Sequence, residues 1–199
     1  MRRTLPVVLA MAGALVFAAC SRQNSTTAAA EPRRLGRLPI GGDFALTNQD
    51  GAKFELAQQR GKIVLLFFGY ASCTEACPIA LTKVKSAYQK LGADAERVQT
   101  IFVSLDPKRD TPAALKSYLE YFKVGAIGLT GKKKELDAVA KLYGASYEIE
   151  KTDSALEYHL KHSTFLYLLD GQGAVRERYL HSDNSDRLVD GIRLLLAEK

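Results

Sequence analysis

The feature that most constrains this chain is an apolar run that ends in a glycine and opens onto two cysteines. Residues 63–68 are uniformly apolar, as expected for a strand that is covered on both faces. Gly69 follows, and then come Cys73 and Cys77, four positions apart. Pro78 and a helical apolar pattern come directly after the second cysteine. Two soft sulfur ligands at a strand-to-helix turn can hold a metal, cycle as a disulfide or staple the turn.

The order of the predicted elements is typical of an α/β domain. The apolar patterns and turn residues predict a hairpin over 44–47 and 53–56, strands over 62–68 and 98–105, helices over 78–91, 111–122 and 136–143, a second hairpin over 164–169 and 174–179, and a final helix over 188–196. A cysteine pair at the first strand-to-helix turn of such a domain indicates a thioredoxin-like fold. We therefore expect a central mixed sheet flanked by helices, with an N-terminal β-hairpin.

The N-terminal region predicts export and anchoring. Residues 1–19 combine two early arginines with an apolar stretch and small residues before Cys20. This pattern resembles a lipoprotein signal in which Cys20 is acylated and holds the protein on a membrane; ordinary signal cleavage near Ala19 is the alternative. Residues 20–38, rich in Ser, Thr, Ala and Arg, predict a flexible tether, and 39–199 the folded domain. We expect this domain in the periplasm or otherwise outside the cytoplasmic membrane.

The charge pattern gives little evidence of a charged partner. The formal net charge is +6, and the basic residues are scattered along the chain. The one run, 132–134, stands where a helix begins, so a solvated helix face is the simpler interpretation. A docking patch for an acidic partner or an anionic lipid is the alternative. Nucleic acid is not an expected partner of an exported protein.

Two thiolates are an incomplete ligand set for a soft ion, so a third ligand is required. The chain has three histidines, His159, His162 and His181. His162 lies directly before the predicted strand 164–169, in the loop that faces the cysteine turn of a thioredoxin-like sheet. No proline follows Pro112, so this loop lacks the cis-Pro of thioredoxin-type reductases, which favours a metal site over peptide binding. Two Cys and one His select Cu(I) or Zn(II) over hard ions.

Three stretches of the chain together resemble the SCO/SenC family: 68–78 with its cysteine pair, 104–112 with the sequence SLDPKRDTP, and 158–163 with its histidine. Members of that family have a thioredoxin-like fold, are tethered to a membrane and bind copper through two Cys and one His. They deliver copper to, or keep reduced, the binuclear copper site of cytochrome c oxidase. Asp106 and Arg109 match the shared segment, and we interpret them either as ordering their loop or as supporting the metal site.

The resemblance implies that Cys73, Cys77 and His162 bind copper, as Cu(I) and also as Cu(II). It implies a copper-accepting oxidase subunit, or another periplasmic copper chaperone, as partner. Two positions depart from the family pattern: Lys161 stands where many members have Asp, and Glu75 replaces the commoner Asp between the cysteines. Loss of a carboxylate beside His162 is expected to alter the orientation of the ring and hence copper affinity. Lys161 either offsets the charge of a dithiolate site or points to solvent.

The main prediction is a binding and delivery protein rather than an enzyme. The alternative is a thiol–disulfide oxidoreductase in which Cys73 and Cys77 are the catalytic redox pair and keep cysteines of an exported copper protein reduced. Copper transfer needs His162, whereas disulfide exchange largely does not. A purely structural disulfide would close a very small loop and stabilise little. A peroxidase is disfavoured because the chain has no Trp and lacks the Pro and Thr or Ser upstream of a peroxidatic cysteine.

Overall fold

The computed structural model describes residues 33–152 and 158–198. The predicted signal over 1–19 and the predicted acylation site at Cys20 lie outside these residues. Among the helices that are described, none has the length and apolar character needed to cross a membrane.

Seven strands form a mixed sheet in the order β2-β1-β5-β4-β3-β8-β9, and two further strands form a separate ribbon, β6-β7. The strands are β1 Ala45–Asn48, β2 Lys53–Glu55, β3 Ile63–Gly69, β4 Val98–Ser104, β5 Ile127–Thr130, β6 Tyr147–Lys151, β7 Tyr158–His162, β8 Phe165–Leu169 and β9 Val175–Leu180. β3 pairs parallel with β4 and antiparallel with β8. β1 and β2 form the predicted N-terminal hairpin.

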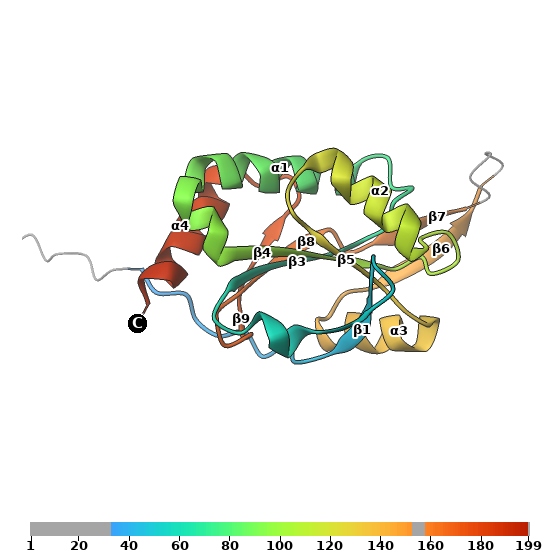
Figure 1. The fold of residues 1–199 in the computed structure, drawn as a ribbon, viewed down its shortest axis with the longest axis horizontal. Coiled ribbons are helices and arrows are strands. Elements are labelled where there is room, and N and C mark those ends of the chain that lie inside the picture. The colour runs from blue at the N-terminus through green and yellow to red at the C-terminus, as the bar shows by residue number, and fades with distance from the viewer. Residues whose placement is uncertain (1–32, 153–157, 199) are drawn as a thin grey trace, which may run out of the picture. The chain divides into compact units, whose positions relative to one another are not determined.

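The helices cover both faces of the sheet. Figure 1 shows α1 and α2 on one face and α3 on the opposite face. The helices are α1 Ala76–Leu91, α2 Pro112–Phe122, α3 Lys133–Leu142 and α4 Ser185–Ala197, with short 3-10 helices η1 Leu56–Gln59 and η2 Gly92–Arg97. The predicted start of α2 is confirmed, since the Thr111 side chain accepts a hydrogen bond from the Ala114 N–H at 3.2 Å and Pro112 is the first helical residue.

Strand β3 lies at the centre of the core. All of its residues are buried, and Leu65, Leu66 and Phe68 have 0% of their surface exposed. The uninterrupted apolar run therefore has the cause expected from sequence, because helices cover both faces of the strand. Its parallel neighbour β4 is buried in the same way at its last five positions.

The ribbon β6-β7 and strand β5 were not predicted from the sequence. His162, which we expected in the loop before β8, is instead the last residue of β7, so the loop placement is wrong. The segment of β6 is half-buried or exposed at every position and gives little apolar signal. Cross-strand pairing with β7 stabilises it, and that pairing is not visible in a local pattern.

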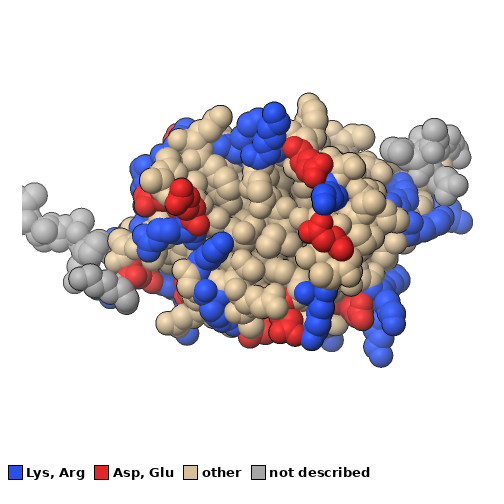
Figure 2. Space-filling model, viewed as in Figure 1, with Lys and Arg blue, Asp and Glu red and all other residues tan. Residues whose placement is uncertain are grey.

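Basic and acidic side chains are interspersed over the face in Figure 2. In the basic run at the start of α3, Lys133 pairs with Asp137 at 2.7 Å. The Lys132 N–H donates to the Glu135 carboxylate at 2.7 Å, in a capping arrangement. These contacts within the helix favour the solvated-face interpretation of the run.

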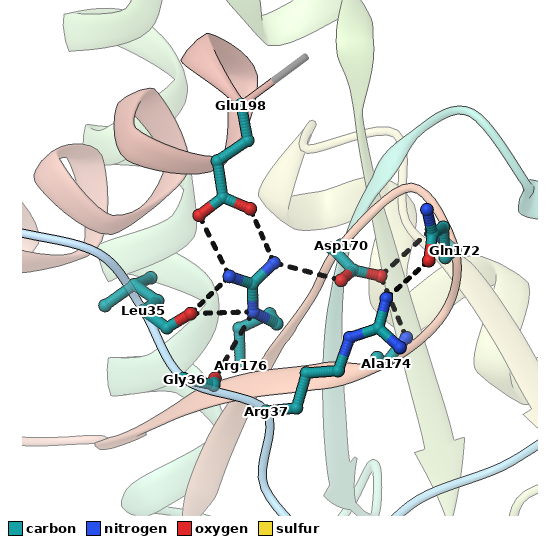
Figure 3. Close-up of polar contacts among 8 residues, drawn as sticks. All are labelled: Leu35, Gly36, Arg37, Asp170, Gln172, Ala174, Arg176 and Glu198. Atoms are coloured by element: carbon teal, nitrogen blue, oxygen red, sulfur yellow. Dashed lines mark hydrogen bonds and ion pairs between the residues drawn. The ribbon is translucent and has the colours of Figure 1, made fainter.

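Arg176 of β9 fastens the N-terminal end of the described chain to the domain. Its guanidinium donates to the carbonyls of Leu35 and Gly36 and pairs with Asp170 at 3.0 Å and Glu198 at 2.7 Å (Figure 3). The Leu35 side chain is itself buried. This stretch of the predicted tether therefore packs against the domain.

Replacing Arg176 with Met should lower the free energy of unfolding by about 3 kcal/mol, because it leaves the buried Asp170 carboxylate without its cation. Both side chains of this pair are 10% exposed. The matched control is Lys116→Met, which breaks the Lys116–Asp50 pair between side chains that are 52% and 55% exposed. That change should cost less than about 1 kcal/mol. Urea denaturation measures both, and equal losses would contradict the role given to Arg176.

Candidate metal centre

The turn between β3 and α1 places the two cysteines. The Cys73 N–H donates to the Tyr70 carbonyl at 3.1 Å, which folds the turn back on itself. Cys77 is the second residue of α1, and its own N–H donates to the Cys73 sulfur at 3.4 Å. The Cys73 sulfur therefore lies at a helix N-terminus, where unpaired N–H groups and the helix dipole stabilise negative charge.

Gly69 makes room for the second sulfur. A Cβ atom at this position would lie 2.6 Å from the Cys77 sulfur and 3.0 Å from the Phe102 ring. Real Cβ atoms essentially never lie as close as 2.6 Å to another atom, so a side chain at position 69 would displace Cys77 or the strand. The glycine at the end of the apolar run is thus needed for space rather than for a turn conformation.

His162 completes the cluster from β7. Its Nε2 atom lies 3.9 Å from the Cys73 sulfur and 3.8 Å from the Cys77 sulfur. Its Nδ1 atom lies 2.9 Å from the Ser163 carbonyl oxygen. Because a carbonyl can only accept, Nδ1 carries the proton and the Nε2 lone pair faces the sulfurs, which is the arrangement found in metal-binding histidines.

The three atoms have the spacing of a metal site. They all lie within 4.8 Å of one another, and no other such group of three is found among the described residues. Bonds of about 2.3 Å to sulfur and about 2.0 Å to nitrogen, as zinc makes, would place S and N about 3.7 Å apart around a three-coordinate ion. The observed S···N distances of 3.8 and 3.9 Å are close to this spacing.

The environment makes the two cysteines different. Hydrogen bonding from the Cys77 side chain, together with backbone groups, lowers the pKa of Cys73 well below its usual range, although burial opposes this. Burial, and then the neighbouring Cys73, raise the pKa of Cys77. Both cysteines are free of disulfides. These opposite shifts favour a thiolate at Cys73 and a thiol at Cys77 in the metal-free pair.

One side of the cluster is open to solvent. A cavity of about 430 Å³ is lined by Cys73, His162, Glu75 and Lys161, among others. The Cys77 side chain, by contrast, is 0% exposed. Both departures from the family pattern, Glu75 and Lys161, therefore line the same cavity as Cys73 and His162.

Sequence reasoning missed one residue beneath the site. Asp110 is 1% exposed, and it accepts hydrogen bonds from the Ala71 N–H at 2.9 Å and the Ser104 hydroxyl at 2.6 Å. Burial raises the pKa of this carboxyl, and the two hydrogen bonds oppose the shift. An acidic residue just before the helix cap Thr111 was the available signal, but it has a simpler explanation in helix capping.

Comparison with known proteins decides the family. The family model described as SCO1/SenC matches residues 32–197. The chain belongs to the SCO1/SenC family. An SCO2-like protein of Rickettsia felis is 37% identical over 157 residues, which cover 78% of this chain and 77% of the relative.

Solved structures agree with this assignment. The copper-bound ScoI of Arabidopsis thaliana has a TM-score of 0.74 at 30% identity and covers 80% of this chain and 99% of its own. The copper-bound ScoI of Bradyrhizobium japonicum has a TM-score of 0.71 at 32% identity and covers 78% and 99%. The predicted family and the predicted thioredoxin-like α/β fold are therefore confirmed.

Adding a methyl group with Gly69→Ala should lower the free energy of unfolding by about 1–3 kcal/mol, the usual cost of overpacking. Gly36→Ala is the matched control, because a Cβ there meets nothing within 4 Å. Thermal or urea denaturation of the metal-free protein measures both changes. If the two variants were equally stable, Gly69 would not be needed to accommodate Cys77.

The difference between the cysteines predicts selective alkylation of the reduced, metal-free protein. Iodoacetamide at pH 6 should modify Cys73 before Cys77, because only Cys73 is then a thiolate. The Cys73 rate should change little between pH 8 and pH 6. The Cys77→Ala variant lacks the main hydrogen bond to the Cys73 sulfur. Its rate of Cys73 modification should therefore fall between pH 8 and pH 6. Peptide mapping provides the readout, and faster modification of Cys77 would overturn the assignment.

Proposed function

We propose that this protein is a membrane-tethered copper chaperone that delivers Cu(I) to the binuclear copper site of cytochrome c oxidase, or maintains that site, during assembly. The observation that carries the proposal is the convergence of Cys73, Cys77 and His162 beside an open cavity. This donor set suits Cu(I) and Zn(II) alike, and copper is favoured because two similar structures, the ScoI proteins, have copper bound. Cu(II) is a second oxidation state that the same ligands would hold.

Delivery is possible because the three ligands differ in their exposure to an incoming partner. Three ligands leave Cu(I) with room for an incoming thiolate, and the cavity leads to Cys73 and His162. An acceptor thiolate can therefore bind the ion first and displace these ligands one at a time. Copper remains Cu(I) throughout, so the transfer is a ligand exchange without a redox step. Each released thiolate or imidazole is then free to take up a proton.

The proposal includes export and anchoring through an acylated Cys20. The partner is a copper-accepting oxidase subunit or another periplasmic copper chaperone. Arg176 of β9 holds Leu35, among the first described residues, and β9 and α4 lie at the end of the domain away from the ribbon β6-β7 (Figure 1). An anchor attached at that end leaves the cavity beside His162 free for the partner.

The test is a competition titration of the reduced full-length protein with a chromogenic Cu(I) chelator. The wild type should bind one equivalent tightly. Cys73→Ser, Cys77→Ser and His162→Ala should each weaken binding, because each removes one of the three ligands. The control is His159→Ala, which changes an exposed histidine paired with Glu150 on the opposite face of β7. Unchanged affinity in His162→Ala would refute its role as a ligand.

The unequal cysteines favour a second function, a thiol–disulfide oxidoreductase. The Cys73 thiolate would attack a disulfide of a target protein and release one target thiolate. Cys77 would then lose its proton and attack the Cys73 sulfur, which releases the second target thiolate and leaves a Cys73–Cys77 disulfide. Two electrons pass from the cysteine pair to the target, and a thiol reductant restores the pair.

Turnover of a disulfide substrate in the presence of excess thiol separates the two functions. The chaperone proposal predicts that His162→Ala loses tight copper binding, while any disulfide exchange persists. Negligible copper binding by the wild type together with rapid turnover would instead assign the protein to disulfide reduction.

A further inference from the structure

The strand that carries His162 is not part of the main sheet. β7 pairs with β6 alone, in a two-stranded ribbon. Side chains along a strand alternate between faces, so Tyr158, Leu160 and His162 share one face. Tyr158 and Leu160 are buried on that face, while His162 reaches the sulfurs. The contacts of this face therefore decide where the third ligand lies.

The loop between β4 and α2 contacts β7 through Asp106 and Arg109. The Arg109 guanidinium donates to the Tyr158 carbonyl at 2.8 Å and lies over the Tyr158 ring, 3.8 Å from its centroid. The Tyr158 hydroxyl donates to the Asp106 carboxylate at 2.7 Å. Arg109 and Asp106 are also an ion pair, and the Asp106 side chain is 3% exposed. Tyr158 is thus held by its ring, its hydroxyl and its backbone at once.

The same loop also contacts the turn that carries the two cysteines, through Asp110 and Leu105. The Asp110 carboxylate accepts from the Ala71 N–H at 2.9 Å, two residues before Cys73. The Leu105 N–H donates to the Gly69 carbonyl at 2.8 Å, where the turn begins. The loop therefore contacts both the strand that carries the imidazole and the turn that carries the sulfurs.

The loop is also fixed internally. The Asp110 N–H donates to the Asp106 carbonyl at 2.9 Å, and the Asp106 N–H donates to the Ser104 hydroxyl oxygen at 3.0 Å. That hydroxyl in turn donates to Asp110 at 2.6 Å. The residues that reach β7 and the residue that reaches the cysteine turn therefore belong to one hydrogen-bonded unit rather than to two independent contacts.

We propose that the loop 104–110, here called the bracket, is a positioning element that sets the distance between His162 and the sulfur pair. Asp106 and Arg109 act on His162 through Tyr158, and Asp110 acts on Cys73 through Ala71. A direct contact assists it, because the Tyr70 ring of the cysteine turn packs edge-on against the His162 imidazole, with ring centroids 5.6 Å apart. The positioning role needs no metal; its consequence for copper rests on the proposed function.

The first test uses the metal-free full-length protein and measures the access of reagent to histidine. Diethyl pyrocarbonate should modify His162 several-fold faster in Tyr158→Phe and in Arg109→Lys than in the wild type, because its strand is no longer fixed. His159, already half-exposed, is the internal reference. The matched control is Tyr179→Phe, which removes a phenol–carboxylate bond of 2.8 Å to Glu177, outside the bracket. Unchanged His162 rates in both Tyr158→Phe and Arg109→Lys would overturn the proposal.

The second test is a double-mutant cycle on Cu(I) affinity. Arg109→Lys should weaken binding about tenfold or more, as losses of outer contacts to metal ligands do. In a His162→Ala background the same change should have almost no further effect, because Arg109 acts through His162. Equal losses in both backgrounds would show a general structural effect and contradict the proposal. If the wild type held no copper while the reagent test succeeded, the proposed function would fail and the bracket would stand.

Discussion

The parallel pairing of β3 with β4 is the constraint on which the rest of the site depends. Gly69 and Ser104 are the last partners in this pairing, so the cysteine turn and the bracket begin side by side at one edge of the sheet. Every residue of β3 is buried, and a displacement of its end would disturb the core. The positions of the sulfurs are therefore set by the core of the domain.

Around that edge, the three proposed ligands differ in access. Cys77 is enclosed beneath Gly69, whereas Cys73 and His162 line the cavity. Under the proposed function, an acceptor would contact Cys73 and His162 at the surface. The buried Cys77 would meanwhile retain the ion until the transfer is complete. The different surroundings of the two cysteines also favour a thiolate at Cys73 and a thiol at Cys77. Copper binding and disulfide exchange thus use the same sulfurs, and His162 is the group that separates them.

The features that were predictable from sequence are those with a local signal. The uninterrupted apolar run gave β3, the apolar spacing before Gly92 gave α1, and Thr111 gave the start of α2. The ribbon β6-β7 was missed because its stability comes from cross-strand pairs and from contacts such as Arg109 on Tyr158. Choosing His162 among three histidines needed an assumed thioredoxin-like fold, and the family resemblance then agreed with that choice. Its place at the end of a strand, and the role of Asp110, follow from distant parts of the chain and have no local pattern.

The proposed function requires that two sulfurs and one imidazole hold a single ion together. The most direct measurement is the X-ray absorption spectrum of the Cu(I)-loaded full-length protein beside that of His162→Ala. We expect two sulfur neighbours and one imidazole nitrogen in the wild type, with loss of the nitrogen contribution in the variant. A copper ion coordinated by sulfur alone, with the same spectrum in both proteins, would contradict it.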